Sequence, residues 1–136
     1  MGKSDLLLLK YQVDKIHFLL NDKFDFKSTK SVKLNQEFSR SIEKIDENHC
    51  KVSLVFSVND NADNPNPFEL NVQISGIFEL DNWEKDDRNV FINTNAIAIL
   101  YPFVRSLVAT VTANANIPSY ILPVFNIAAW FEENDK

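Results

Sequence analysis

Apolar and polar residues alternate along two segments of the chain, residues 50–58 and 68–80. The apolar members are Cys50, Val52, Leu54, Phe56 and Val58 in the first segment, and Phe68, Leu70, Val72, Ile74, Phe78 and Leu80 in the second. A period of two is typical of a β-strand that buries one face. The polar loop between the segments, residues 59–67, contains two prolines and favours an antiparallel hairpin.

A third strand is predicted upstream of this hairpin, where apolar residues alternate less regularly. These residues are Val32, Leu34, Phe38 and Ile42. The turn signal Asp46-Glu47-Asn48 connects this strand to the one that begins near residue 50.

The N-terminal part of the chain predicts another strand, in which the apolar phase changes. Apolar residues fall on odd positions before residue 14 and on even positions after residue 15. They are Tyr11, Val13, Ile16, Phe18 and Leu20. A β-bulge near Asp14-Lys15 corrects such a slip. We therefore expect four antiparallel strands before Asp81.

A helix is predicted in the C-terminal third, where charged residues become rare. Between Asn93 and Phe131 the only formally charged side chain is Arg105. One apolar stripe at helical spacing contains Ile97, Leu100, Val104, Leu107, Val108 and Val111. Proline is tolerated in the first turn of a helix but not in its interior, so we expect the helix to begin near Pro102.

The other side of this predicted helix carries small uncharged residues in place of the Lys or Glu that usually face solvent. They are Ala109, Thr110, Thr112 and Ala113. We predict that a second subunit covers this side, through a contact formed by Val108, Ala109, Thr112 and Ala113. The alternative is burial inside the same domain. A membrane span is disfavoured, because Pro102 and Arg105 interrupt a run that needs roughly 20 apolar residues.

The segment after the helix, residues 117–125, is apolar although its two prolines forbid a regular helix. We interpret it as an apolar loop that caps the core or lines a groove. A short helix is predicted from Asn126, a capping residue, to Glu133.

Length and composition limit the possible functions. The 136 residues fit a single domain, residues 1–136, and the formal charge of -5 disfavours nucleic acid as a partner. Cys50 is the only cysteine, which suits a reducing cytosol, and the apolar run of residues 6–9 is too short for a signal-peptide core. We expect a cytoplasmic protein.

No catalytic or metal-binding pattern is found in the sequence. The chain has two glycines, so it lacks a glycine-rich phosphate loop. His49 is interpreted as a solvated turn residue, because too few other ligands accompany it for a metal site. Cys50, its neighbour in a strand, points to the opposite face and is interpreted as a buried, unreactive thiol. The protein is expected to be no enzyme and to need no cofactor or metal.

Four short segments, in this order and spacing, strongly resemble the SecB family. They are Ser75-Gly76-Ile77-Phe78-Glu79-Leu80, Ile99-Leu100-Tyr101-Pro102-Phe103-Val104-Arg105, Ile117-Pro118 and Leu122-Pro123-Val124-Phe125-Asn126. The family pattern joins a Gly-Ile-Phe strand, a helix that opens with Leu-aromatic-Pro-aromatic followed by Arg, and a Leu-Pro loop that ends in Asn. The resemblance extends from about residue 11 to residue 131.

This resemblance implies an α+β fold, in which a four-stranded antiparallel sheet carries the helices on one face. It also implies a homotetramer built as a dimer of dimers, with the long helices sandwiched between the sheets. Members of the family are chaperones that bind unfolded, often pre-secretory polypeptides in apolar grooves without ATP. Many of them deliver these clients to the motor SecA.

Aromatic and aliphatic residues of the helix and the apolar loop suit client binding. The candidates are Tyr101, Phe103, Ile117, Tyr120, Ile121, Leu122 and Phe125, with Phe18, Phe24, Phe26 and Trp83 as weaker ones. In the best-known members SecA docks on acidic positions of the sheet, and the aligned residues here are Leu20, Phe24 and Asn71. Because that acidic pattern is missing, the resemblance does not imply SecA docking of this kind.

Two alternatives remain open at this stage. One is a SecB-like chaperone dedicated to an antitoxin or another single client. The other, from a different class, is a small lipophile-binding protein or isomerase, which would require a closed pocket that contains a carboxylate.

Overall fold

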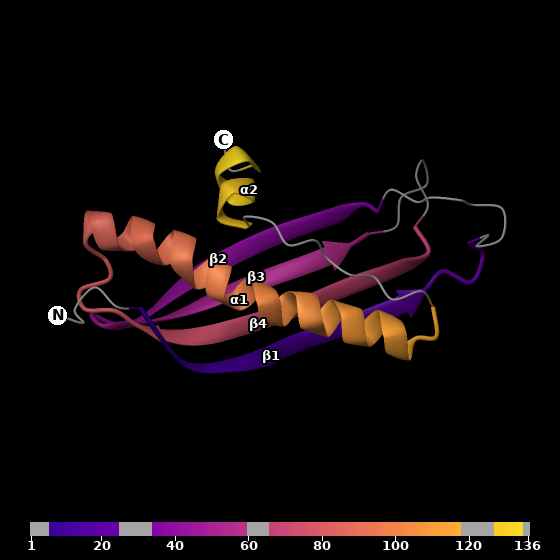
Figure 1. Cartoon of the computed structure of the whole chain (residues 1–136), viewed down its shortest axis with the longest axis horizontal. Coiled ribbons are helices and arrows are strands. Elements are labelled where there is room, and N and C mark those ends of the chain that lie inside the picture. The colour runs from indigo at the N-terminus through magenta and orange to yellow at the C-terminus, as the bar shows by residue number, and fades with distance from the viewer. Residues whose placement is uncertain (1–5, 25–33, 60–65, 118–126, 135–136) are drawn as a thin grey trace.

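The computed structural model describes residues 6–24, 34–59, 66–117 and 127–134. Four strands form one antiparallel sheet, and two helices lie on one of its faces (Figure 1). The strands are β1 (Leu7–Leu20), β2 (Gln36–Asp46), β3 (His49–Val58) and β4 (Phe68–Glu79), and the helices are α1 (Asp86–Asn114) and α2 (Ile127–Asn134). The predicted α+β fold class is confirmed.

The strand order is β1-β4-β3-β2, so β1 and β2 are the two edges. The two hairpins expected from the alternation are present, with Phe56 opposite Phe38 on β2 and opposite Val72 on β4. The even-numbered apolar residues of β3 and β4 all point to the helix side of the sheet, where they are buried. This face is one wall of the core.

Strand β1 contains the bulge that its apolar phase predicts. Its register on β4 shifts between Val13 and Lys15, which leaves Asp14 as the extra residue. A second shift between Leu8 and Lys10 was not predicted. As a result, the apolar residues on both sides of Asp14 face the helix side of the sheet, opposite even-numbered residues of β4.

Helix α1 begins at Asp86, well before the start expected near Pro102, and Pro102 lies inside it. That expectation was wrong, because tertiary packing outweighs the local cost of proline. Leu100, Tyr101 and Val104 are buried on either side of Pro102, and Pro102 itself is exposed. Proline cannot donate to the carbonyl of Ala98. Ala98 is also exposed, so water can replace the lost hydrogen bond.

Among the described residues, α1 is the one helix long and apolar enough to cross a membrane by length and composition alone. In this fold its apolar side packs mainly on β3 and β4 (Figure 1). The predicted short helix after residue 126 is confirmed as α2, which packs on α1.

Gly76 lies where β1, β4 and α1 converge. A methyl group at this position would lie 2.8 Å from Leu8 Cδ1, 2.9 Å from Phe78 Cε2 and 3.2 Å from Leu100 Cδ2. We expect Gly76→Ala to lower the free energy of unfolding by about 1–3 kcal/mol through overpacking. Urea denaturation at a fixed protein concentration measures this change.

The matched control for this change is Ser41→Ala, a small residue exposed on β2, which is expected to change the stability by less than about 0.5 kcal/mol. A stabilising effect of Gly76→Ala would show that β1, β4 and α1 pack less tightly around Gly76 than the contact distances indicate.

Candidate functional site

An incompletely covered row of apolar side chains follows the edge strand β1. The row consists of Tyr11, Val13, Ile16 and Leu20, which are 48%, 46%, 53% and 41% exposed, and we call it the β1 apolar row. All four residues lie opposite buried residues of β4 and therefore point to the helix side of the sheet. Phe18, between two of them, is half-buried and stacks on Phe68 with ring centroids 5.5 Å apart.

The β1 apolar row remains open because α1 lies mainly over the two central strands. Its clearest contact with α1 is made by Tyr11, whose ring stacks on Phe103 at a centroid distance of 4.3 Å. Contiguous apolar side chains on an exposed edge strand are unusual in a monomer and typical of a surface that binds another polypeptide.

The exposed side of α1 carries a second apolar or weakly polar surface. Thr94, Ala98, Pro102, Ser106 and Thr110 are all exposed and recur at every fourth position. We call them the α1 stripe. None of these side chains is charged, so another helix could approach closely without burying a charge.

Of the four predicted interface residues, two are buried within the single chain. Val108 and Thr112 have no exposed surface, and Thr112 Oγ1 donates to the carbonyl of Val108 over 2.9 Å. Ala109 is half-buried and Ala113 is exposed. For Val108 and Thr112, therefore, the alternative interpretation applies, in which the helix is buried inside its own domain.

The structure describes three of the seven predicted client-binding residues. Tyr101 is buried, 5% exposed, with its ring edge-on to Phe38 at 6.0 Å. Phe103 is half-buried against Tyr11, and Ile117 is half-buried against the core. Tyr120, Ile121, Leu122 and Phe125 lie outside the described residues.

Among the weaker candidates, Phe24 is half-buried, and Phe26 lies outside the described residues. Trp83 is buried, and its indole Nε1 donates to the carbonyl of Asp46 over 2.8 Å. Trp83 therefore anchors the chain before α1 and offers little surface to a client.

Helix α2 covers the aromatic side chains near β2. Trp130 meets Phe38 edge-on at 5.3 Å, and the Arg40 guanidinium carbon lies 4.4 Å from the centre of the Phe131 ring. Arg40 also donates to the carbonyl of Asn93 on α1 over 3.2 Å. Arg40 thus ties β2 to both helices, and sequence patterns gave no indication of this role.

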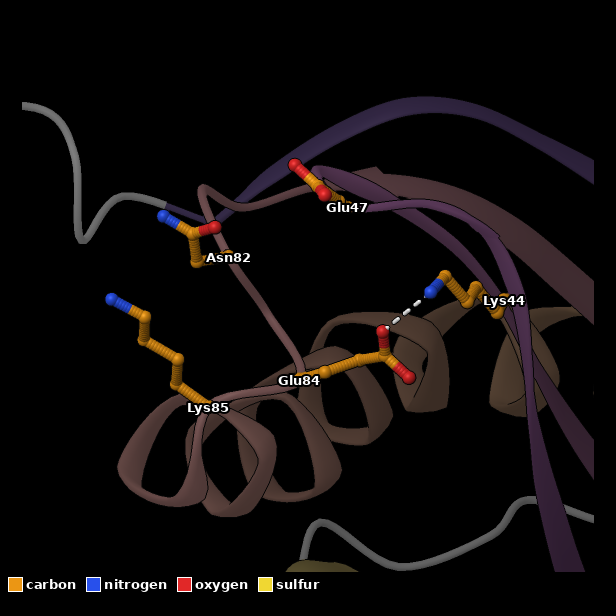
Figure 2. Close-up of a pocket in the computed structure, with 5 residues that line it drawn as sticks. All are labelled: Lys44, Glu47, Asn82, Glu84 and Lys85. Atoms are coloured by element: carbon orange, nitrogen blue, oxygen red, sulfur yellow. Dashed lines mark ion pairs between the residues drawn. The ribbon is translucent and has the colours of Figure 1, made fainter.

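A hollow of about 220 Å3 lies between the β2–β3 turn and the start of α1 (Figure 2). It is lined by Lys44, Glu47, Asn82, Glu84 and Lys85. An ion pair joins Lys44 Nζ to Glu84 Oε1 at 2.8 Å. This hydrogen bond raises the pKa of Lys44 and keeps its amine charged.

A second hollow, of about 360 Å3, lies at the end of β1 between Leu19 and Lys23, with Glu69 across from it. Both hollows contain carboxylates, and Leu19 and Leu20 in the second one are the apolar residues among those that line them. Neither of these two hollows offers the apolar enclosure that a lipophilic ligand requires.

The two candidate reactive residues, Cys50 and His49, have surroundings that are typical of structural residues. Cys50 is buried, and burial raises the pKa of its thiol to about 11, which leaves the thiol protonated and unreactive. The interpretation of His49 as a solvated turn residue was incomplete. His49 is half-buried and contacts both Asp46 and Glu79. No group of three or more potential metal ligands occurs among the described residues.

These observations define a class of protein, an α+β domain with helices on one side of an antiparallel sheet and with open apolar surface along an edge strand. The family model for the preprotein translocase subunit SecB matches residues 20–136. The chain belongs to the SecB family.

Two relatives show how far the similarity extends. An uncharacterized protein of Methanocaldococcus jannaschii is 33% identical over 129 residues, which cover 93% of this chain and 82% of that protein. The protein-export protein SecB of Acinetobacter baumannii is 38% identical over 101 residues, 74% of this chain but only 66% of that protein.

A solved structure of a SecB-like chaperone of Mycobacterium tuberculosis, in complex with a peptide from an antitoxin, has the same fold. It superposes with a TM-score of 0.70 at 14% identity and covers 88% of this chain and 90% of that one.

Proposed function

We propose that this protein is a molecular chaperone that holds unfolded polypeptides, including pre-secretory ones, without using ATP. The observation that carries the proposal is the apolar surface that Phe103 and Ile117 leave partly open on α1 and directly after it, in a chain that belongs to the SecB family. A chaperone of this kind needs apolar contacts and no reaction chemistry.

The client-binding surface is proposed to combine Phe103 and Ile117 with the apolar segment 118–125. Phe103 and Ile117 are half-buried and lie at the C-terminal half of α1 and directly after it. Burying apolar surface contributes about 25 cal/mol per Å2 and is non-directional, so such a surface can accept clients of unrelated sequence.

The protein is proposed to work in the cytoplasm as a homotetramer, a dimer of dimers. Two uncharged surfaces support assembly. The β1 apolar row lies at a sheet edge, where one subunit can join another, and the α1 stripe can accept a neighbouring helix. Ala109 and Ala113 border this stripe, and they retain the interface role predicted for them.

A chaperone dedicated to one antitoxin is the second candidate. It is favoured by the Mycobacterium tuberculosis structure, which contains a SecB-like chaperone with an antitoxin peptide. A general holdase should bind several unrelated unfolded proteins with similar dissociation constants, whereas a dedicated chaperone should bind one peptide far more tightly. Leu20, Phe24 and Asn71, which align with the acidic SecA-docking positions of the best-known members, carry no charge and so would not support SecA docking of that kind.

The proposal predicts that Tyr120→Ala combined with Ile121→Ala weakens client binding. Removing an aromatic side chain from a binding surface costs on the order of 1–3 kcal/mol, or about 5-fold to more than 100-fold in the dissociation constant. The measurement is protection of a chemically unfolded protein against aggregation in the absence of ATP, together with the melting temperature and the oligomer size.

The matched control is Val90→Ala with Phe91→Ala, an adjacent aliphatic and aromatic pair that is exposed at the other end of α1. Client protection should be unchanged by the control and reduced by the Tyr120/Ile121 variant at equal stability. Loss of stability with normal client binding would assign the segment to the core instead.

A further inference from the structure

His49 is held between two carboxylates that come from different parts of the chain. Its Nδ1 lies 2.7 Å from Asp46 Oδ1, at the end of β2 where the β2–β3 turn begins, and its Nε2 lies 3.1 Å from Glu79 Oε1, at the end of β4. The sheet register also places His49 directly opposite Glu79. The imidazole therefore bridges the turn and the last residue of β4.

This geometry selects one protonation state of the ring. An ionised carboxylate only accepts hydrogen bonds, and a neutral imidazole has a single N–H. A neutral His49 can therefore donate to one of the two carboxylates, while its other nitrogen presents a lone pair to the second. The imidazolium form donates to both, and both bonds are then charge-assisted.

The same turn positions the beginning of α1. The amide of Leu80 donates to the carbonyl of Asn48 over 2.9 Å, and the amide of Trp83 donates to the carbonyl of Glu47 over 3.2 Å. Trp83 lies three residues before α1 begins, and its buried indole donates to the carbonyl of Asp46. The turn is thus joined to the β4–α1 connection beside the hollow in Figure 2.

We propose that His49 is a proton-controlled clamp, which in its doubly protonated form ties the β2–β3 turn to the end of β4 and steadies the start of α1. Loss of one proton releases one of the two carboxylates and loosens this joint. The clamp is independent of the proposed chaperone function, because it concerns only how the helix is attached to the sheet.

The neighbouring charges define the pH range of the clamp. The hydrogen bond from His49 to Asp46 is the main cause that raises the pKa of His49, and Glu79 adds to it. The pKa of Asp46 is lowered, first by the Asn48 amide that donates to it and then by His49. The clamp is therefore lost as the pH rises through the raised pKa of His49.

Other charged groups surround the clamp and modify it. Glu47, Asp81 and Glu84 add negative charge at the turn and the connection, although Lys44 pairs with Glu84. Lys10 of β1 and Lys51 of β3 both lie opposite Ile77, two positions from Glu79 on the same face of the sheet. Because the folded-state pKa of His49 is raised, the stabilisation is present at lower pH and is lost as the pH rises through that value.

The test is an NMR titration of the 136-residue chain between about pH 5.5 and 9, a range that brackets the ordinary histidine pKa of about 6.5. It follows the His49 ring and the indole N–H of Trp83. The indole signal is expected to shift with the same midpoint as His49, while the indole of Trp130 on α2 serves as the control that does not follow it. In the Glu79→Gln variant, the glutamine amide can donate a hydrogen bond to the neutral His49 ring. The titration midpoint shared by His49 and Trp83 should therefore move to lower pH.

In His49→Gln the pH-dependent shift of Trp83 should disappear, with the Trp130 signal showing that the fold is kept. The clamp would be refuted by a Trp83 shift that persists with the same midpoint in His49→Gln. It would also be refuted by an unchanged His49 midpoint in Glu79→Gln.

Discussion

Replacing Phe56 by alanine should lower the free energy of unfolding by about 3–5 kcal/mol, a large share of the roughly 5–15 kcal/mol that stabilises a typical domain. Phe56 has no exposed surface and packs against Phe38 with ring centroids 4.9 Å apart. It lies on β3, a central strand paired on both sides, so its removal leaves a cavity that neighbouring elements cannot close. Urea denaturation at fixed protein concentration gives the value.

Phe91→Ala provides the comparison for the same chemical change. Phe91 is 38% exposed on α1, and its truncation should cost less than about 1 kcal/mol. Similar losses of unfolding free energy in Phe56→Ala and Phe91→Ala would contradict a core centred on the helix side of the central strands.

Ile16→Asp is expected to disrupt the proposed assembly. If the β1 apolar row forms a subunit contact, the new carboxylate is buried without a partner, which costs several kcal/mol for each subunit, and the apolar contact of Ile16 is lost as well. Light scattering or sedimentation at micromolar concentration should then show smaller particles, while circular dichroism remains that of a folded protein.

Leu19→Asp is the matched control, since Leu19 is 56% exposed on the same strand but lies opposite Glu69, on the other face of the sheet. It should leave the oligomer intact. Equal dissociation by both variants would point to general damage to β1, and intact assembly in Ile16→Asp would exclude the β1 apolar row as the contact.

The strands could be predicted because each central strand has one buried face, so alternation records which residues meet the core. The bulge at Asp14 could be predicted because Gln12 separates Tyr11 from Val13 and His17 separates Ile16 from Phe18, so the apolar alternation is visible on both sides of it. The shift near Leu9 could not be predicted, because residues 6–9 are all leucine and such a run does not show which positions face the core.

The start of α1 and its side away from the sheet were harder to predict. Pro102 suggested that the helix begins near it, but burial of Leu100 and Val104 supplies more stabilisation than one interior proline removes. Thr112 looked like part of an outer face, but its hydroxyl is satisfied by carbonyls of its own helix, so it can be buried at little cost.

The candidate site was predicted only in part because composition does not distinguish buried from exposed aromatic residues. Tyr101 and Phe103 have similar sequence surroundings, but one lies in the core and the other next to the β1 apolar row. The bridge from His49 to Glu79 spans 30 positions in the chain, so only the paired strands bring the two residues together.

The bulge at Asp14 has a consequence for how sequences of this family can vary in length. Val13 lies opposite Ile74 and Lys15 opposite Gln73, so the partner strand skips Asp14. Deleting this residue would restore regular pairing without turning any other side chain of β1 to the opposite face. Deleting Leu9, the extra residue of the second register shift, would have the same effect, whereas a deletion elsewhere in the strand would turn the side chains between it and a bulge to the opposite face. Relatives one residue shorter in this strand are therefore expected to have lost the residue at position 9 or 14.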